Sequence, residues 1–410
     1  MRLQLRPPRR RLAAFAGAAL CVSGLLVAPA RATQDAAARL TLFREPSSAN
    51  AGISVVHPQL DLGTTLGPDF HFAAGYEVDI VSGATPSVYR VDAVSTATKF
   101  SDTRHQVHGA LAYQRPTSAW SFGYSYGWES DYRSGAVTGT TTSDLLDHNF
   151  TVGLSYTHNF DRVCDANNSN IGDQPLDLKP LTLSAHCFGG ETDVTTHKLA
   201  IDTFQPSLSW TATPKLLLQL GSTIQILDGF QSNPYRSVLV GMQSRTPQER
   251  LPQFRQRYAV FGRAVYALPA VRASGLFMAR LYEDTWAVQA ATGEVVLNKY
   301  FGPGLLVTLR GRYHLQSGAS FYRDARGYLE LGPGGQYWTG DRELSPMSNY
   351  LTGGKLAFIR HPGQERTSWY VDMELDAKYE LLIYHLNSPD APNADRARAH
   401  IVQGAFSLRF

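Results

Sequence analysis

The sequence has little charge, few cysteines and, beyond its first 32 residues, no long apolar run. Only 18% of its 410 residues are charged and the mean hydropathy is −0.22, a balance that fits neither a disordered chain nor a bundle of membrane helices. Without an apolar run of about 20 residues, the body of the chain cannot cross a bilayer as a helix. The length would allow two or three soluble domains, whereas a β-barrel of this length forms one.

The basic surplus is confined to the N-terminus. The net charge of +3 includes six arginines among the first 32 residues, which contain no acidic residue. The remaining chain has 32 of the 38 basic residues and all 35 acidic ones. A body that is slightly acidic lacks the basic surface of nucleic-acid-binding proteins, so we expect no nucleic-acid partner.

Residues 1–32 predict a signal peptide. A cationic stretch through Arg11 is followed by an apolar run from Leu12 to Val27 and then by alternating small residues. An uncleaved membrane anchor is the alternative, although the run is short for one. We expect export, with a mature protein that starts near Arg31 or Thr33 and forms a single domain over 33–410.

Two of the three cysteines, Cys164 and Cys187, lie in the part that would be exported. An even pair in an exported protein favours a disulfide. A metal site is less favoured, because neither cysteine stands in a Cys-x-x-Cys pair.

Strict alternation of apolar and polar residues recurs along the chain. From Trp120 to Trp128, aromatic residues alternate with small or polar ones, and from Trp369 to Leu381 apolar residues alternate with charged ones. Between Val307 and Gln316, a third segment sets leucine, valine and tyrosine against arginine, threonine and histidine. Each pattern predicts a strand with one apolar and one polar face.

The length of these segments favours strands that cross a membrane. Strands in soluble sandwiches average about five or six residues, whereas a tilted bilayer crossing needs about 9–11. Aromatic residues lie at both ends of the apolar faces, as interfacial girdles require. We therefore expect an all-β, transmembrane antiparallel β-barrel in the bacterial outer membrane, with outer-membrane lipid around it.

The chain ends in the same alternation. Phe406, Leu408 and Phe410 occupy every second position up to the final residue. This ending resembles the C-terminal signal by which outer-membrane barrels reach the barrel insertion machinery, which is therefore an expected partner.

Fifteen strands can be placed from the alternation and the turns between them. They are expected near 36–45, 52–62, 70–81, 104–114, 119–132, 146–160, 196–210, 215–228, 253–267, 273–286, 288–300, 305–317, 347–360, 368–383 and 400–410. Short connections suit the periplasmic side and long ones the outside. The long extracellular loops are expected at 82–103, 133–145, 229–252, 318–346 and 384–399.

Parity requires one further strand, because bacterial single-chain barrels have an even number. We expect it within Leu176 to Cys187, which gives about 16 strands, with 14–18 possible. A full crossing between Cys164 and Cys187 would hold them too far apart to bridge. The alternative is that 161–193 is a disulfide-closed insert.

The faces that would point into the lumen carry the charge. A basic sector gathers Arg255, Arg257, Arg263, Arg280, Arg310 and Arg312 from neighbouring strands. One strand provides an acidic row of Asp372, Glu374, Asp376 and Glu380. Facing walls of opposite charge would create a transverse field used by a channel for polar solutes. Alternatively, the charges pair with one another and brace the wall.

The loop 318–346 is the expected plug or constriction, folded into the lumen. Its residues for a constriction or ligand site are Tyr322, Arg323, Asp324, Trp338 and Asp341. Aromatic rings beside charges would bind a sugar or another polar ligand. The alternative is that they pack the loop on itself.

Several short stretches resemble a group of bacterial outer-membrane proteins, domain-of-unknown-function family 3570. They are Ser82-Gly83-Ala84-Thr85-Pro86, Asp92-Ala93-Val94, Phe100-Ser101-Asp102-Thr103-Arg104, Asn233-Pro234-Tyr235-Arg236, Tyr282-Glu283-Asp284-Thr285-Trp286, and Gln316-Ser317 with Phe321-Tyr322-Arg323. The resemblance implies an outer-membrane barrel and carries no activity or catalytic residues. The segment 162–190 departs from the family pattern.

Motifs for catalysis are missing from the sequence. No histidine stands in a Gly-x-Ser-x-Gly or His-Glu-x-x-His setting, and there is no Cys-x-x-Cys-His for covalent haem. We expect no catalytic residues, no metal and no cofactor. The expected function is a porin-like channel or transporter for a small polar solute. The alternatives are a closed barrel that acts as a scaffold or surface-binding module for a co-encoded partner and, less favoured, a hydrolase at the rim.

Overall fold

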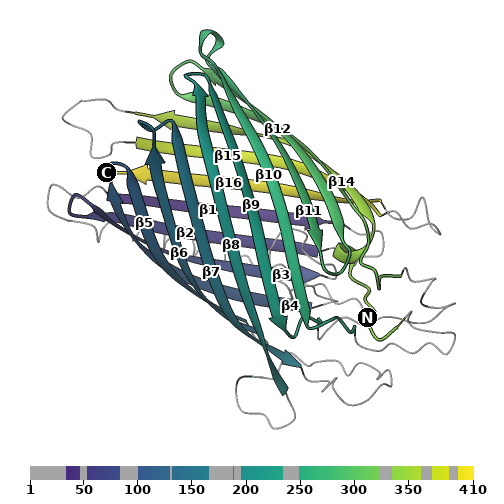
Figure 1. Cartoon of the computed structure of the whole chain (residues 1–410). Helices are drawn as coiled ribbons and strands as arrows, with labels where there is room; N and C mark the ends of the chain where they lie inside the picture. Colours follow the sequence, from purple (N-terminus) through teal and green to yellow (C-terminus); the bar gives the residue numbers. More distant parts are fainter. Residues whose placement is uncertain are drawn as a thin grey trace, which may run out of the picture.

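The computed structural model describes residues 34–46, 53–83, 100–129, 132–165, 188, 195–233, 249–323, 328, 335–361, 372–386 and 396–410. In these residues, sixteen antiparallel strands form one closed barrel, drawn in Figure 1. Each strand pairs with its neighbours in sequence, and the first strand pairs with the last. The antiparallel barrel of about 16 strands predicted from the sequence is confirmed.

The strands are long and evenly distributed. They are β1 (Gln34–Glu45), β2 (Ile53–Leu66), β3 (Phe70–Gly83), β4 (Phe100–Arg115), β5 (Ser118–Trp128), β6 (Tyr132–Leu145), β7 (Phe150–Asp165), β8 (Thr195–Thr213), β9 (Leu216–Gly229), β10 (Phe254–Leu268), β11 (Ala273–Asp284), β12 (Gln289–Phe301), β13 (Leu305–Gln316), β14 (Met347–Arg360), β15 (Asp372–Leu386) and β16 (Arg396–Arg409). In the part of the chain that the structure describes, two short 3-10 helices accompany them, η3 (Pro269–Val271) and η4 (Arg342–Leu344). Among the described residues, no helix is long and apolar enough to cross a membrane.

The barrel has two different ends. At the turn end, which also carries the C-terminus, most connections are short, such as 116–117, 214–215 and 302–304. At the loop end, the longest connections are 166–194 and 317–346. This asymmetry is typical of outer-membrane barrels, which have short periplasmic turns and long outer loops.

The ends of the chain close the ring. β1 and β16 pair from Asp35 with Arg409 to Arg44 with His400. Beyond them, the Gln34 N–H donates to the Phe410 carbonyl at 2.8 Å, and the Phe410 N–H donates to the Gln34 carbonyl at 2.9 Å. A closed ring has no unpaired edge, so its backbone polar groups are satisfied as a bilayer core requires.

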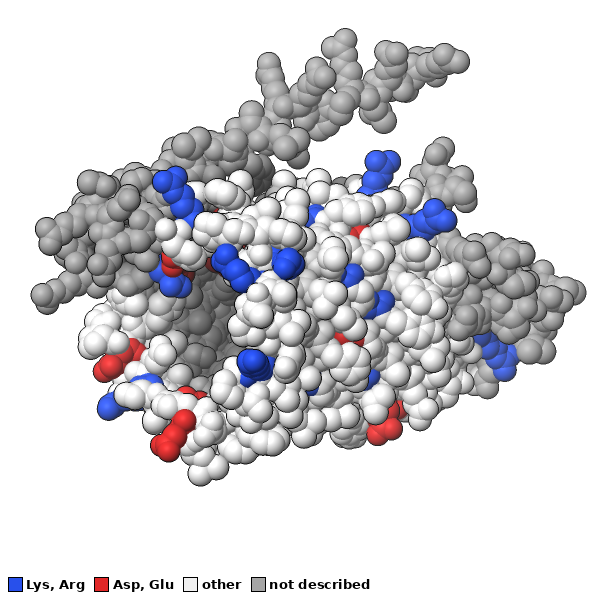
Figure 2. All heavy atoms as spheres, turned by 90° about the horizontal axis from the view of Figure 1, so that it is seen from above, with Lys and Arg blue, Asp and Glu red and all other residues white. Residues whose placement is uncertain are grey.

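The outer face of the barrel is apolar. On β5, Trp120, Phe122 and Tyr124 are exposed by 47%, 63% and 46%, while Ser121 and Gly123 between them face inward. Figure 2 shows that neutral residues make up most of the described wall on the viewed side, with scattered charged residues. Exposed apolar side chains on this scale are solvated by lipid rather than water.

Aromatic side chains lie near both ends of the outer face. Close to the turn end, the ring of Tyr113 lies 4.8 Å from that of Phe70 and 5.8 Å from that of Trp120. Close to the loop end, His105 stacks on Trp128 with ring centroids 5.2 Å apart. Trp120 and Trp128 therefore occupy the two girdle positions expected of them.

The prediction of a loop at 133–145 is wrong, because these residues form β6. Its serine, threonine and glycine residues alternate only weakly, so no apolar face marks the strand. A tight turn at 146–149 joins β6 to β7, with Leu146, Asp147 and His148 all at positive φ. The strand expected to end at 132 ends at Trp128, and the one expected at 146–160 is β7.

The strand expected within Leu176 to Cys187 falls outside the described residues. β7 pairs directly with β8 from Phe150 with Trp210 to Asp165 with Thr195, so the ring has no further strand between these two. The even count is completed by β6 instead. This removes the conflict between a crossing strand and a disulfide.

Cys164, near the loop end of β7, is buried and disulfide-bonded. Cys187 lies outside the described residues, and so does most of the expected insert 161–193, apart from the end of β7 and Phe188. The expected signal peptide, residues 1–32, lies outside them as well and stays a prediction. The pairing of Cys164 with Cys187 stays a prediction.

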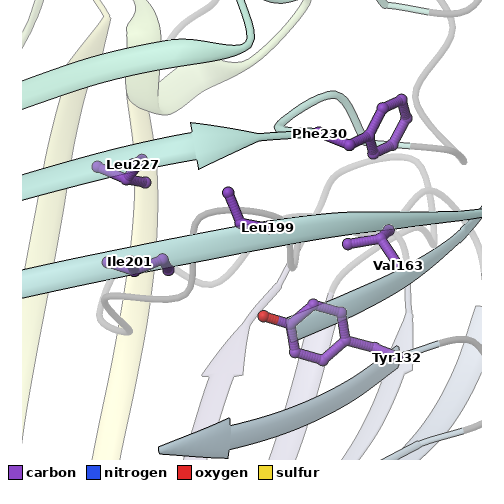
Figure 3. Packing of buried hydrophobic residues seen from close by; sticks show 6 residues of the cluster. All are labelled: Tyr132, Val163, Leu199, Ile201, Leu227 and Phe230. Atoms are coloured by element: carbon purple, nitrogen blue, oxygen red, sulfur yellow. The ribbon is translucent and has the colours of Figure 1, made fainter. Parts of the chain in front are cut away.

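Apolar side chains cover parts of the inner face at the loop end. One cluster on β6 to β9 consists of Tyr132, Val163, Leu199, Ile201 and Leu227 with the adjacent Phe230, shown in Figure 3. A second cluster joins Leu351, Leu382, Tyr384 and Ala399 of β14 to β16. Since these side chains are at most 7% exposed, the interior is densely packed at both places.

Candidate functional site

A cavity of about 760 Å³ lies inside the barrel, between the wall and the loop 317–346. Its wall comes from β8 to β14, and the loop contributes Asp341, Glu343 and Leu344. The cavity is lined mainly by polar side chains because the inward positions of these strands alternate with the apolar outward ones.

Five of the six arginines predicted for the lumen line this cavity. They are Arg255 and Arg257 of β10, Arg280 of β11, and Arg310 and Arg312 of β13. The sixth, Arg263, is on the same face of β10 but nearer the turn end, where it is exposed outside the cavity lining. The sequence thus placed the arginines on one face, and the strand order brings five of them together.

Arg255 is held by the residues of the β11–β12 turn. Its Nε donates to Asp284 at 3.0 Å, and its guanidinium lies 4.1 Å from the centre of the Trp286 ring. The other oxygen of Asp284 accepts the backbone N–H groups of Trp286 at 2.9 Å and Val288 at 3.0 Å. The Tyr282 hydroxyl also donates to Asp284, at 2.7 Å.

Arg310 lies between two carboxylates. Its guanidinium is 2.7 Å from Glu294 of β12 and 3.0 Å from Glu380 of β15. The contact to Glu380 passes over β14 at Gly353, where a Cβ would lie 2.7 Å from Glu380 Cγ and still closer to the backbone of Tyr379. Only glycine leaves room for this cross-strand pair.

The acidic row of β15 does not face the basic sector across the barrel. Only β14 separates β15 from β13, so the two charged regions are neighbours. Glu374 pairs with Lys355 at 3.3 Å, Glu380 with Lys378 at 3.3 Å, and Asp376 lies 3.9 Å from Lys355. The remaining member of the row pairs at the turn end, where Asp372 lies 3.6 Å from Arg409 and 2.5 Å from His361. The geometry therefore supports charge pairing within the wall for this row.

Different carboxylates occupy the wall opposite the arginines. In a ring of sixteen strands, β2 and β3 stand eight places from β10 and β11. Their inner faces, with those of β1 and β4, combine carboxylates with histidines. His57 lies 2.6 Å from Asp79 and 3.5 Å from Glu77.

Two further histidine–carboxylate pairs each span an intervening strand. His71 of β3 lies 3.3 Å from Asp35 of β1, and His108 of β4 lies 3.2 Å from Asp61 of β2. The strands between them carry glycine at the crossing points, Gly63 and Gly75, where a Cβ would collide with these side chains. Alternation alone assigns these residues to the inner face, but only the register reveals the pairs.

The loop 317–346 is fastened to the wall by Arg342. This arginine donates to both oxygens of Glu45 at 2.8 and 3.1 Å, and its guanidinium lies 4.8 Å from the Tyr384 ring. Burial lowers the pKa of Arg342, but the hydrogen bonds and charge of Glu45 outweigh it, so that the pKa is raised. Arg342 is therefore charged at any physiological pH and pairs with a carboxylate at the end of β1.

The other predicted loop residues have different environments. Tyr322 packs against the cluster around Trp286, and Trp338 is buried and exchanges backbone hydrogen bonds with Arg250 at 3.0 Å. The backbone N–H of Arg323 donates to the Tyr328 hydroxyl at 3.3 Å. The Asp341 carboxylate accepts the N–H of Glu343 at 2.9 Å and lines the cavity. Asp324 lies outside the described residues.

Burial raises the pKa of Tyr328, whose hydroxyl also accepts the N–H of Thr339 and donates to the Phe321 carbonyl. This neutral hydroxyl joins two parts of the loop. Tyr322 and Trp338 thus help to pack the loop, while Asp341 is the predicted loop residue that reaches the cavity.

The predicted insertion signal lies on the outer face of β16. Phe406 is exposed there by 41%, two positions before Leu408 and four before Phe410. The backbone of Phe410 closes the ring against Gln34. Nothing in the described structure assigns these side chains a role in the lumen.

Within the described residues, no group of three or more His, Cys, Asp or Glu is arranged to hold a metal ion. His105 and His108 lie on opposite faces of β4, where their partners are Tyr76 and Asp61.

A closed antiparallel ring with an apolar outside, aromatic girdles and a polar interior defines an outer-membrane β-barrel. The chain belongs to a family described as "Protein of unknown function (DUF3570)", whose profile matches residues 12–358. Several residues of the resembling stretches build the site, including Asp284 and Trp286 at the β11–β12 turn. No curated protein matches the sequence.

Solved outer-membrane proteins resemble the chain at low identity. A structure described as "Bacterial polysaccharide outer membrane secretin" has a TM-score of 0.46 at 9% identity, and the match covers 92% of this chain and 98% of that one. A BenF-like porin from Pseudomonas fluorescens Pf-5 has 0.43 at 8% identity, covering 93% and 99%. OpdK from Pseudomonas aeruginosa, solved with vanillate, has 0.40 at 8% identity, also covering 93% and 99%. The assignment to the outer membrane rests on the barrel and the family.

Proposed function

We propose that the protein is a porin-like channel for small polar solutes in the bacterial outer membrane. The observation that carries this proposal is the polar cavity inside the barrel, lined by five arginines under the loop 317–346. A protein that needed only a stable wall would fill the interior with neutral side chains, because isolated charges are costly to bury.

The arrangement of charge supports a conducting lumen. Arginines of β10, β11 and β13 occupy one side, and carboxylates of β1 to β3 occupy the opposite side. Opposed charges create a transverse field that orients dipolar solutes and holds water in the pathway. The loop 317–346 narrows this pathway from one side in our proposal.

The test is ion conduction by the purified protein in planar lipid bilayers under a salt gradient. The proposal predicts discrete conductance steps. The double variant Arg280→Glu, Arg312→Glu is expected to shift the reversal potential so that the permeability ratio of cations to anions rises several-fold. The double variant Asp61→Asn, Asp79→Asn is expected to lower this ratio. Arg44→Gln, on the outer face, is the control without an expected shift. A folded barrel that gives no current contradicts the proposal.

A closed barrel that presents its loops to a partner is the second candidate. The buried apolar clusters at the loop end favour it, because they show that parts of the inner face are covered. Such a barrel gives no current, and a co-encoded partner co-purifies with it from cross-linked membranes. Recovery of the barrel alone counts against this candidate.

The surroundings of the barrel follow from its outer face, which is in contact with outer-membrane lipid. We infer further that Phe406, Leu408 and Phe410 direct the chain to the insertion machinery. Their alternation along the lipid-facing side of the last strand supports this inference. Replacement of Phe410 by serine is expected to lower the amount of folded barrel in the membrane without changing its synthesis.

A further inference from the structure

The cavity arginines differ in how their charge is balanced. Arg255 and Arg310 have carboxylate partners, as described above. Arg257 instead donates to the neutral side chain of Gln225 at 3.0 Å. Arg280 forms no ion pair with any residue that the structure describes, and its guanidinium lies 5.6 Å from the centre of the Tyr282 ring. Of these two arginines, Arg257 also lies near the carboxylates of Asp284 and Glu343, so Arg280 is the cavity arginine whose charge has no carboxylate partner among the described residues.

Polar side chains of the neighbouring strands surround Arg280. The register places Thr292 of β12 beside Arg280, and His314 of β13 beside Thr292. The Thr292 hydroxyl lies 2.8 Å from Nδ1 of His314. Arg312 follows two positions away on the same face of β13, so two arginines and a histidine gather on one side of the cavity.

Neutral polar side chains line the other side. The register sets Thr203, Gln225 and Arg257 in one row across β8, β9 and β10. Gln225 donates to the Thr203 hydroxyl at 3.1 Å, and this fixes the amide oxygen toward Arg257. Gln205 and Thr223 add further hydroxyl and amide groups to the lining.

We propose that the cavity binds a small hydroxylated organic acid. Its carboxylate pairs with Arg280, and its hydroxyl groups bond to threonine and glutamine side chains of β8 and β9. A guanidinium is the side chain best suited to a carboxylate, because it offers two parallel N–H donors. The proposal rests on the proposed function, since the solute reaches the cavity through the lumen.

The size of the cavity fits this ligand class. Its volume of about 760 Å³ lies within the range of ordinary ligand pockets, about 300–1,000 Å³. A six-carbon acid with its hydration water fits this space. An anion with an apolar body would offer no hydrogen bond to the amide and hydroxyl groups of β8 and β9.

Isothermal titration of the folded full-length mature barrel in detergent tests the site with two matched probes, gluconate and its uncharged counterpart sorbitol. Gluconate is expected to bind at least about ten-fold more tightly than sorbitol, because a hydrogen bond to a charged group contributes about 1.5–3 kcal/mol. Arg280→Gln is expected to remove this preference. Arg263→Gln, on the same wall outside the cavity, is expected to leave both affinities within about two-fold.

Two outcomes would overturn the site: equal binding of the two probes by the folded wild-type barrel, or no binding of gluconate. Folding is checked by heat-modifiable electrophoretic mobility. If Arg280→Gln does not fold, Arg280→Lys serves instead, and it should weaken gluconate while keeping some preference over sorbitol. Binding of gluconate by a barrel that carries no current would refute the channel and leave the proposed site intact. Current through a barrel that does not prefer gluconate to sorbitol would refute the site and leave the channel intact.

Discussion

Asp284 illustrates how a single buried carboxylate organises this barrel. One oxygen holds the backbone of the β11–β12 turn through Trp286 and Val288, and the other neutralises Arg255. The turn includes Ala287 at a φ of 68°, a conformation that a residue other than glycine adopts only when its surroundings impose it. Asp284 therefore connects the turn geometry to the charge of the cavity.

We expect Asp284→Ala to lower the free energy of unfolding by about 3–5 kcal/mol, because it leaves the Arg255 charge buried without a partner. The control is Glu283→Ala, the adjacent carboxylate on the outer face, which is exposed. Its expected effect is within about 1 kcal/mol. Equilibrium urea unfolding in phospholipid vesicles measures both. Equal losses in the two variants would show that Asp284 has no such role.

At the scale of elements, the part of the loop 317–346 around η4 is tied to the wall by an ion pair and by side-chain hydrogen bonds. Arg342 with Glu45 ties it to β1, and the side chain of Gln316 donates to the carbonyls of Glu343 and Ser345 at 2.8 Å each. The Arg342 and Glu45 side chains are 11% and 6% exposed. A buried pair of this kind is strongly destabilised when one partner loses its charge.

We expect Glu45→Gln to release this part of the loop. Trypsin should then cleave within 317–346 at least about ten-fold faster, because a loss of 1.4 kcal/mol already raises the open population ten-fold. The substitution leaves all trypsin sites of the loop unchanged. Arg44→Gln, one residue away on the outer face, should leave the rate as it is. Equal cleavage rates in the two variants would mean that the ion pair of Arg342 with Glu45 does not hold the loop.

The sequence predicts strands where their two faces differ. β5, β13 and β15 combine long alternation with aromatic or charged residues. The alternation of every second residue therefore predicts both that they are strands and which side chains point outward. β6 is different, because small hydroxyl residues occupy both its faces and nothing distinguishes the lipid side. Parity revealed that one strand was missing, but it could not show where.

The alternation also predicts part of the candidate site, namely which charged side chains point inward. Alternation places Arg280, Arg310 and Arg312 on the inner face, but it does not say which charge meets which. Ion pairs that cross a strand, such as His108 with Asp61 over Gly75, depend on register and on the absence of a Cβ. The acidic partners of the arginine wall could be recognised only after the closed strand order was known.

At the scale of the whole molecule, the outer and inner faces of the sheet have different compositions and different surroundings. The apolar outside matches the bilayer, and the inside concentrates charge on opposed walls around a polar cavity. Closure makes this possible because every backbone group finds a partner within the ring. A channel of this kind requires that water reaches the cavity from both ends of the barrel.

Cysteine accessibility on β12 tests this requirement most directly. Thr292 lines the cavity, whereas Val295, three residues along the same strand, is exposed by 46% on the outer face. In planar bilayers, a charged, membrane-impermeant thiol reagent should modify Thr292→Cys from either side and reduce its current, while Val295→Cys should be unaffected. Modification of Thr292→Cys from only one side, or from neither, would contradict a water-filled path through the barrel.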